Sequence, residues 1–140
     1  MRPMQIAVPR FDPTIGDLAG NARLILEAAE SAVAAGAHVV LLPDLALCGY
    51  PPRDLLLRKG FVDACEQELD RLAAMLPPDV LVLVGTPVHG PRPTVRNALV
   101  ALRDGTRVVA AAKRLMPDYD VFDEDRWFTP GQSASIVQHC

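Results

Sequence analysis

The chain has 140 residues and a mass of 15.1 kDa, and 50% of its side chains are hydrophobic while 22% are charged. This composition suffices for one domain with a buried core, over residues 1–140, and excludes a disordered chain. No uncharged apolar run approaches the ~20 residues of a membrane span, and the first residues lack the apolar stretch of a secretory signal peptide. The net charge of −3, without a basic stripe, gives no indication of nucleic-acid binding.

Cysteine and histidine usage bears on cellular location and on metals. The three cysteines are an odd number and lie far apart in the chain, which favours a reducing cytoplasm over a disulfide framework. The three histidines, His38, His89 and His139, do not cluster with cysteines at metal-ligand spacing. We therefore expect no metal site.

Hydrophobic patterning predicts that strands and helices alternate in the first part of the chain. Apolar residues at spacings of three and four indicate amphipathic helices, and continuous apolar runs indicate buried strands. Asp17 can cap the first helix and Gly36 can end it. The predicted elements are, in chain order, a strand over 5–8, a helix over 18–33, a strand over 37–42, a loop over 43–54, a helix over 62–76 and a strand over 80–84.

The pattern changes after residue 84. The link over 85–96 is rich in glycine and proline and cannot hold a crossover helix. Two apolar runs, 97–102 and 107–112, flank the dipeptide Asp104-Gly105, which is a strong signal for a β-hairpin. We therefore predict an α/β fold whose mixed sheet carries its helices on one face.

The segment over 113–131 reads KRLMPDYDVFDEDRWFTPG and is polar, acidic and aromatic. It is too irregular for an element of the core. A loop of this length inside a compact domain is usually functional. We therefore expect it to contribute to a site.

Three segments resemble a known family: DPTIGDLAGNARLI over 12–25, LLPDLALCGYPPRDLL over 41–56, and the segment over 113–131. Together they resemble the N-terminal glutaminase domain of the glutamine-dependent NAD synthetases. That domain is a branch of the nitrilase, or carbon–nitrogen hydrolase, superfamily. The resemblance runs over essentially the whole chain and implies a nitrilase-like αββα sandwich.

The resemblance also implies a chemistry. In the family a Glu, a Lys and a Cys act together on glutamine, because a carboxamide is a poor electrophile and needs a thiolate nucleophile. The Lys ammonium stabilises the oxyanion of the tetrahedral intermediate. The released ammonia passes to a synthetase domain, which is the part that uses ATP and Mg²⁺, so no cofactor is implied for this chain. Full-length relatives assemble as homo-oligomers.

Position by position, the family Glu falls on Asp44 and the family Lys on Lys113. Each follows the end of a predicted strand, where a loop begins and where site residues are common. Tyr119 and Phe122 match positions that line the glutamine pocket, and Tyr50 matches another aromatic residue near it. We therefore expect Asp44 and Lys113 to project into a common pocket with Tyr119 on its wall.

The sequence departs from the family pattern in two ways. The family nucleophile opens a Cys-Glu-Asp turn reached after two further strands, whereas only nine residues follow Gly131 and the last of them is Cys140. Two strands and a turn do not fit in that length, so we expect the chain to stop before the nucleophile and to be inactive in isolation. Asp44 is one methylene shorter than Glu, and Cys48 is expected to be a small buried thiol.

Three other interpretations stay open. The chain can be a non-catalytic remnant, with an unpaired sheet edge and exposed apolar surface that favour self-association. It can be another carbon–nitrogen hydrolase that acts on a different amide or nitrile. Polar residues at strand ends, among them Asp12, Asp17, Asp44, Thr86 and Lys113, also suggest a receiver-like signalling domain, although the predicted hairpin is against a doubly wound sheet.

Overall fold

The structure is a computed structural model that describes residues 3–138. In chain order its elements are β1 (Ile6–Ala7), α1 (Leu18–Ala34), β2 (Val39–Leu41), the 3₁₀ helix η1 (Arg53–Leu57), α2 (Phe61–Met75), β3 (Leu81–His89), β4 (Val95–Arg103), β5 (Thr106–Ala112) and the 3₁₀ helix η2 (Glu124–Arg126). Within residues 3–138, neither helix is long and apolar enough to cross a membrane.

The five strands form one mixed sheet in the order β1-β2-β3-β4-β5. The pairs β1–β2 and β2–β3 are parallel, and the pairs β3–β4 and β4–β5 are antiparallel. Asp104 and Gly105 both have positive φ, 49° and 76°, as a two-residue hairpin turn requires. The predicted hairpin is confirmed, and the receiver-like alternative is wrong because no helix crosses over after β3.

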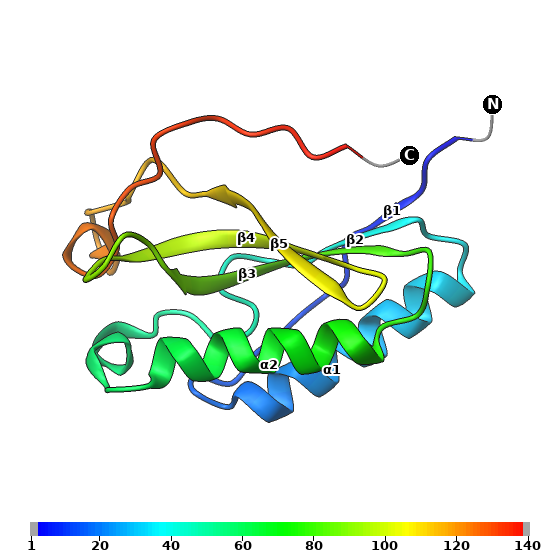
Figure 1. Ribbon diagram of the computed structural model, residues 1–140, viewed down its shortest axis with the longest axis horizontal. Helices are drawn as coiled ribbons and strands as arrows, with labels where there is room; N and C mark the ends of the chain where they lie inside the picture. Colours follow the sequence, from blue (N-terminus) through cyan, green and yellow to red (C-terminus); the bar gives the residue numbers. More distant parts are fainter. Residues whose placement is uncertain (1–2, 139–140) are drawn as a thin grey trace.

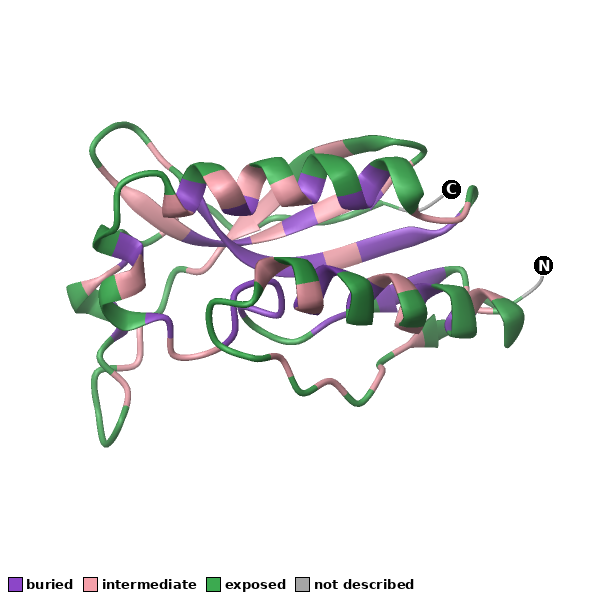
Figure 2. Cartoon of the chain, turned by 90° about the horizontal axis from the view of Figure 1, so that it is seen from below, coloured by how far each residue is buried: buried purple, intermediate pink, exposed green. Residues whose placement is uncertain are grey.

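Both α-helices cover the same face of the sheet (Figure 1). The side chain of Asp17 accepts a hydrogen bond from the Gly20 N–H, so it caps α1 as predicted. Buried residues follow the strands and the sides of the helices that face them, while the outer sides of the helices are exposed (Figure 2). The core contains, among others, Ile25, Leu69, Leu72, Val82, Val84, Val100 and Leu102.

Strand β3 is longer than predicted and runs through Pro87 to His89. The backbone groups of Leu81, Leu83 and Gly85 point towards β2 and the turn that follows it. By alternation the nitrogen of Pro87 points to the same side. Strand β2 pairs with β3 only as far as Leu83, so a missing N–H at Pro87 breaks no bond of the sheet.

The face of the sheet that points away from the helices is apolar. Four residues are paired in one row across β2, β3, β4 and β5, and they are Leu41, Leu83, Ala101 and Val108. We call this surface the open face. Leu41 and Val108 are exposed there. The segment after Gly131 lies on this side of the sheet (Figure 1).

One residue of β5 has no partner in the ladder. Leu99 pairs with Ala111, whereas the next residue, Val100, pairs with Val109, so Ala110 is an extra residue, a β-bulge. Because of this bulge Ala111 points to the same face of the sheet as Val108.

The segment over 113–131 contains only the short helix η2, as its irregular sequence predicts. It nevertheless contributes to the interior, because Glu124 and Phe128 are buried.

Candidate active site

Asp44 lies in a tight turn that follows β2. The turn is held against the end of β3, because the Leu47 N–H donates to the Gly85 carbonyl at 3.2 Å. A Cβ at Gly85 would lie only 2.6 Å from the Leu45 nitrogen and from the Pro43 oxygen. Only glycine lets the turn come this close, so Gly85 sets the position of Asp44.

Lys113 is the first residue after β5. Its N–H donates to the Asn97 carbonyl at 2.8 Å, and its own carbonyl accepts from the Gly131 N–H at 2.8 Å. The backbone of Lys113 is thus fixed on both sides, once by β4 and once by the end of the long polar segment. These bonds direct the side chain towards Asp44.

The structure brings Asp44 and Lys113 together, although 69 positions separate them. The Lys113 Nζ donates to Asp44 Oδ2 at 2.7 Å and to Glu124 Oε1 at 3.0 Å. Glu124 Oε1 also accepts from the Tyr50 hydroxyl at 2.9 Å, and Asp44 Oδ1 accepts from the Asn97 Nδ2 at 2.9 Å. The five side chains form one hydrogen-bonded row with the ammonium between two carboxylates.

Electrostatics keep Lys113 charged. Partial burial lowers the pKa of Lys113, but the hydrogen bonds and charges of Asp44 and Glu124 outweigh it and hold the pKa above the ordinary value. Burial and the hydrogen bond to Glu124 raise the pKa of Tyr50, so its hydroxyl stays a donor. The row therefore offers a fixed positive charge and a carboxylate next to it.

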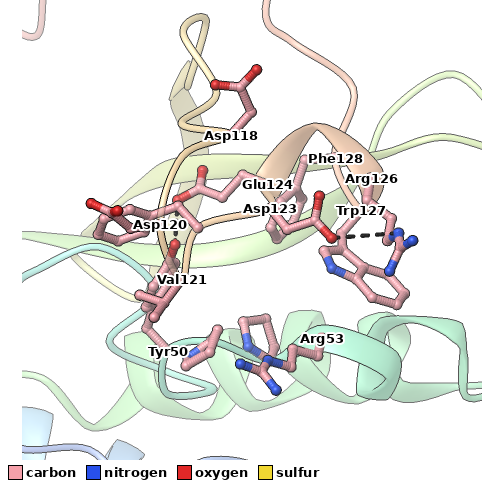
Figure 3. A pocket seen from close by; sticks show the side chains of 13 residues that line it. Tyr50, Arg53, Asp118, Asp120, Val121, Asp123, Glu124, Arg126, Trp127 and Phe128 are labelled. Carbon is pink, nitrogen blue, oxygen red and sulfur yellow. Dashed lines mark hydrogen bonds and ion pairs between the residues drawn. The ribbon is translucent and has the colours of Figure 1, made fainter.

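Asp44 and Lys113 line a cavity of about 250 Å³ at the edge of the open face, together with Gly85, Asn97 and Leu99. A larger cavity of about 460 Å³ lies on the other side of Glu124 and contains neither Asp44 nor Lys113. Figure 3 shows it with Glu124 bonded to Tyr50 and with acidic and aromatic side chains around it. We place the candidate reaction in the smaller cavity, because the charged pair is there.

The three aromatic residues expected at the pocket lie in one ring cluster, with Phe122 between Tyr50 and Tyr119. Tyr50 and Phe122 line the larger cavity. Tyr119 is 63% exposed and lines neither of the two cavities, so the expected place of Tyr119 on the wall beside Lys113 is wrong. The rings of Tyr119 and Phe122 lie 5.5 Å apart in a T-shaped arrangement.

The thiols of the described residues do not lie at the surface. Cys48 and Cys65 are both fully buried and free. Burial raises the pKa of Cys48 to about 12 and that of Cys65 further still, so both stay protonated at neutral pH. Cys140 and His139 lie outside the described residues. Within residues 3–138 no group of three His, Cys, Asp or Glu side chains is placed to hold a metal ion.

Comparison with known proteins assigns the fold and the family. The model of the family described as carbon–nitrogen hydrolase matches residues 5–139. The chain belongs to the carbon–nitrogen hydrolase family. The nitrilase-like α/β fold expected from the sequence is confirmed by solved structures. A glutamine-dependent NAD+ synthetase of Acinetobacter baumannii matches 97% of this chain with a TM-score of 0.87 and 27% identity, over 26% of its own chain.

An amidase of the nitrilase superfamily from Nesterenkonia matches 98% of this carbon–nitrogen hydrolase chain with a TM-score of 0.75 and 26% identity, over 52% of its own length. Among curated sequences, a glutamine-dependent NAD(+) synthetase of Synechocystis sp. is 46% identical over 88% of this chain. One of Xylella fastidiosa is 41% identical over 94%. The chain spans 23% and 24% of the length of these two relatives.

Sequence reasoning missed two members of the row, Glu124 and Asn97. Glu124 stands in a run of acids between Asp123 and Asp125 and is 4% exposed. The part of the segment that resembles the family pattern ends on this Glu, which is the signal that could have identified it. The sequence predicts Asn97 as the start of a strand, and Asn97-Ala98 matches an Asn-Ala pair of the family pattern, but neither assigns Asn97 a role in the site. A polar residue at the start of an otherwise apolar strand is the signal that could have identified it.

Proposed function

We propose that this chain is part of a glutaminase domain that hydrolyses the side-chain amide of glutamine, with the ammonia serving NAD(+) synthesis. The observation that carries the proposal is the position of the Lys113 ammonium between the carboxylates of Asp44 and Glu124. The names of the synthetase relatives support glutamine as the amide donor.

In this proposal Asp44 is the general base. Its carboxylate takes the proton of a cysteine thiol, and the thiolate adds to the carbonyl carbon of the amide. Although Asp44 is one methylene shorter than Glu, its carboxylate lies 2.7 Å from the Lys113 ammonium. The Asp44 proton then passes to the departing nitrogen, so that ammonia leaves and a thioester remains.

Lys113 stabilises the charge that develops in the addition step. The carbonyl oxygen becomes an oxyanion, and an ammonium that is already held in place lowers the energy of that state without reorganising. Water then hydrolyses the thioester to glutamate and regenerates the thiol. Tyr50 and Phe122, which line the larger cavity on the other side of Glu124, are proposed to contact the rest of the glutamine molecule.

The thiol is the part of this chemistry that residues 3–138 do not supply. Cys48 and Cys65 are buried and protonated, and neither donates or accepts a bond with Asp44 or Lys113. We propose that the nucleophile, the synthetase part with its ATP and Mg²⁺, and contacts for homo-oligomer assembly belong to the remaining length seen in the relatives. Residues 3–138 by themselves are then inactive.

A chimera tests the proposal. Residues 1–140 replace the matching segment of the Synechocystis sp. synthetase, and ammonia release from glutamine is measured. We expect turnover in the chimera, and a fall in kcat of ~10²–10³-fold in Lys113→Met, because a donor to the oxyanion is lost. Lys59→Met is the matched control, since Lys59 is the second lysine of the chain and lies outside the row.

Other outcomes of the chimera experiment decide against the proposal. A folded chimera that releases ammonia from simple amides but not from glutamine indicates a different carbon–nitrogen hydrolase, as the likeness to the amidase allows. A folded chimera that hydrolyses neither indicates a non-catalytic remnant. The first outcome would contradict glutamine as the substrate, and the second would contradict catalytic activity. Neither would change the assignment of the chain to its family.

A further inference from the structure

Asn97 makes two hydrogen bonds, one to Asp44 and one to Lys113. Its side-chain Nδ2 donates to Asp44 Oδ1 at 2.9 Å, and its backbone carbonyl accepts from the Lys113 N–H at 2.8 Å. No other described residue is hydrogen-bonded both to the side chain of Asp44 and to the backbone of Lys113. Asn97 therefore joins two segments that are far apart in the chain.

The neighbours of Asn97 on β4 do not explain why a polar residue is buried at position 97. The next residues of β4 on the same face of the sheet are Leu99 and Ala101, and both are apolar. Asn97 is only 3% exposed, and a buried amide costs free energy unless it is hydrogen-bonded. Its bond to Asp44 is what makes an amide acceptable there.

The Asn97 amide is an uncharged donor, and an uncharged donor leaves the Asp44 carboxylate able to act as a base. Asn97 occupies Asp44 Oδ1 without adding a charge, while Lys113 occupies Oδ2. The carboxylate plane is thereby fixed by one bond at each oxygen. A second cation at Oδ1 would fix the plane equally well but would compete with Lys113 for the same negative charge.

We propose that Asn97 is a positioning residue that orients the Asp44 carboxylate towards Lys113 and sets the distance between them. This inference rests on the proposed function for its catalytic meaning, but the orientation itself is a property of the chain that can be measured without substrate. The charged and titratable groups that bear on Lys113 are Asp44, Glu124 and, through Glu124, Tyr50.

The test is an NMR titration of the Lys113 side chain. The chain has two lysines, Lys59 and Lys113, so a sample labelled with ¹³C at the lysine ε-carbon gives two signals, and Lys59 serves as the internal reference. The variant is Asn97→Leu, which keeps the shape of the side chain and removes the donor. We expect its Lys113 titration midpoint to move below that of the parent chain, because a carboxylate that can rotate pairs less well.

Three further variants make the result decisive. Asp44→Asn removes the carboxylate charge and gives the end point of the shift. Thr86→Val changes another buried polar residue, on β3, whose hydroxyl is bonded only to the neighbouring Pro87 carbonyl. It should leave the Lys113 midpoint in place. Asn97→Ala replaces Asn97→Leu if the latter fails to fold.

An unchanged Lys113 midpoint in a folded Asn97 variant overturns the inference, and so does an equal shift in Thr86→Val. Because the titration uses neither glutamine nor a nucleophile, it can succeed even where the chimera shows no glutaminase activity. Failure of the two ideas is therefore distinguishable.

Discussion

At the scale of single residues, the two tyrosines show how burial separates similar side chains. Both rings contact Phe122, but only the hydroxyl of Tyr50 is bonded, to a glutamate that is itself buried. A hydrogen bond from a hydroxyl to a buried carboxylate contributes to stability as well as to the arrangement of the site. Tyr119, in contrast, is an exposed residue.

We therefore expect Tyr50→Phe to lower the free energy of unfolding by roughly 1.5–3 kcal/mol, the range for a hydrogen bond to a charged group. Tyr119→Phe is the matched control and should change it by less than ~0.5 kcal/mol. Urea denaturation followed by circular dichroism measures both. Equal stability of the two variants would mean that the Tyr50–Glu124 bond does not form.

A second prediction concerns alkaline pH. Burial raises the pKa of Cys48 from 9.0 to about 12. The folded chain therefore holds a proton that the unfolded chain releases first, so this contribution to stability is complete below pH 9 and is lost as the pH rises towards 12. Cys48→Ala should lose less stability across this window than the parent chain, although it is about 1 kcal/mol less stable at neutral pH because packing is lost.

The measurement is the free energy of unfolding in urea at several pH values from 8 to 12. Tyr50, Cys65 and Lys113 also have raised pKa values and make every curve fall in the same direction. The informative quantity is therefore the difference in slope between the two proteins. A parent curve no steeper than that of Cys48→Ala contradicts a buried, protonated thiol.

At the scale of elements, the site is made where turns press against strands. The turn that carries Asp44 rests on Gly85 of β3, and Lys113 is held between β4 and the end of the polar segment. Together with the bond from Lys113 to Glu124 of η2, these contacts place the two side chains. The ends of β2 and β5 and the adjoining parts of β3 and β4 are thus the framework of the site.

Two glycine substitutions distinguish the cost of a steric clash with neighbouring backbone from the cost of a positive φ. Gly105→Ala meets no atom within 4 Å and suffers only from its positive φ, so we expect a loss of about 1 kcal/mol. Gly85→Ala would place its Cβ 2.6 Å from backbone atoms and should cost more, roughly 2–3 kcal/mol. Thermal or urea denaturation compares them. A milder effect at Gly85 would show that the Asp44 turn can move away.

The elements with local signals were predictable from the sequence. The periodicity of α1, its cap at Asp17 and the Asp104-Gly105 turn each depend on a few neighbouring residues. The extension of β3 through Pro87 was not, because it depends on where β2 ends. At the site, strand ends and the family resemblance brought Asp44 and Lys113 to notice, whereas the role of Glu124 depends on burial, which no run of acids reveals.

At the scale of the whole molecule, the two faces of the sheet differ in how far they are covered. Both helices cover one face, and the apolar row on the open face retains exposed side chains at β2 and β5. Exposed apolar surface of this kind favours association. The cavity with Asp44 and Lys113 lies at the edge of the same face.

We expect the isolated chain to self-associate, with a sedimentation coefficient that rises with protein concentration. Val108 is 64% exposed in the apolar row, so Val108→Lys should weaken the association. Leu115→Lys is the control, because Leu115 is exposed but lies beyond β5 in the polar segment. A parent chain that sediments as a monomer at every concentration contradicts the prediction.

The bulge in β5 determines which insertions and deletions this strand can accept. Strict alternation counted from the hairpin would turn position 113 towards the helices, and the unpaired Ala110 reverses that parity. Inserting one more residue elsewhere in β5 would reverse the alternation again. The Lys113 ammonium would then point into the apolar core beneath the helices, although every residue of the site would still be present. We therefore expect β5 to tolerate insertions and deletions less well than it tolerates substitutions, and less well than the other segments of the chain do.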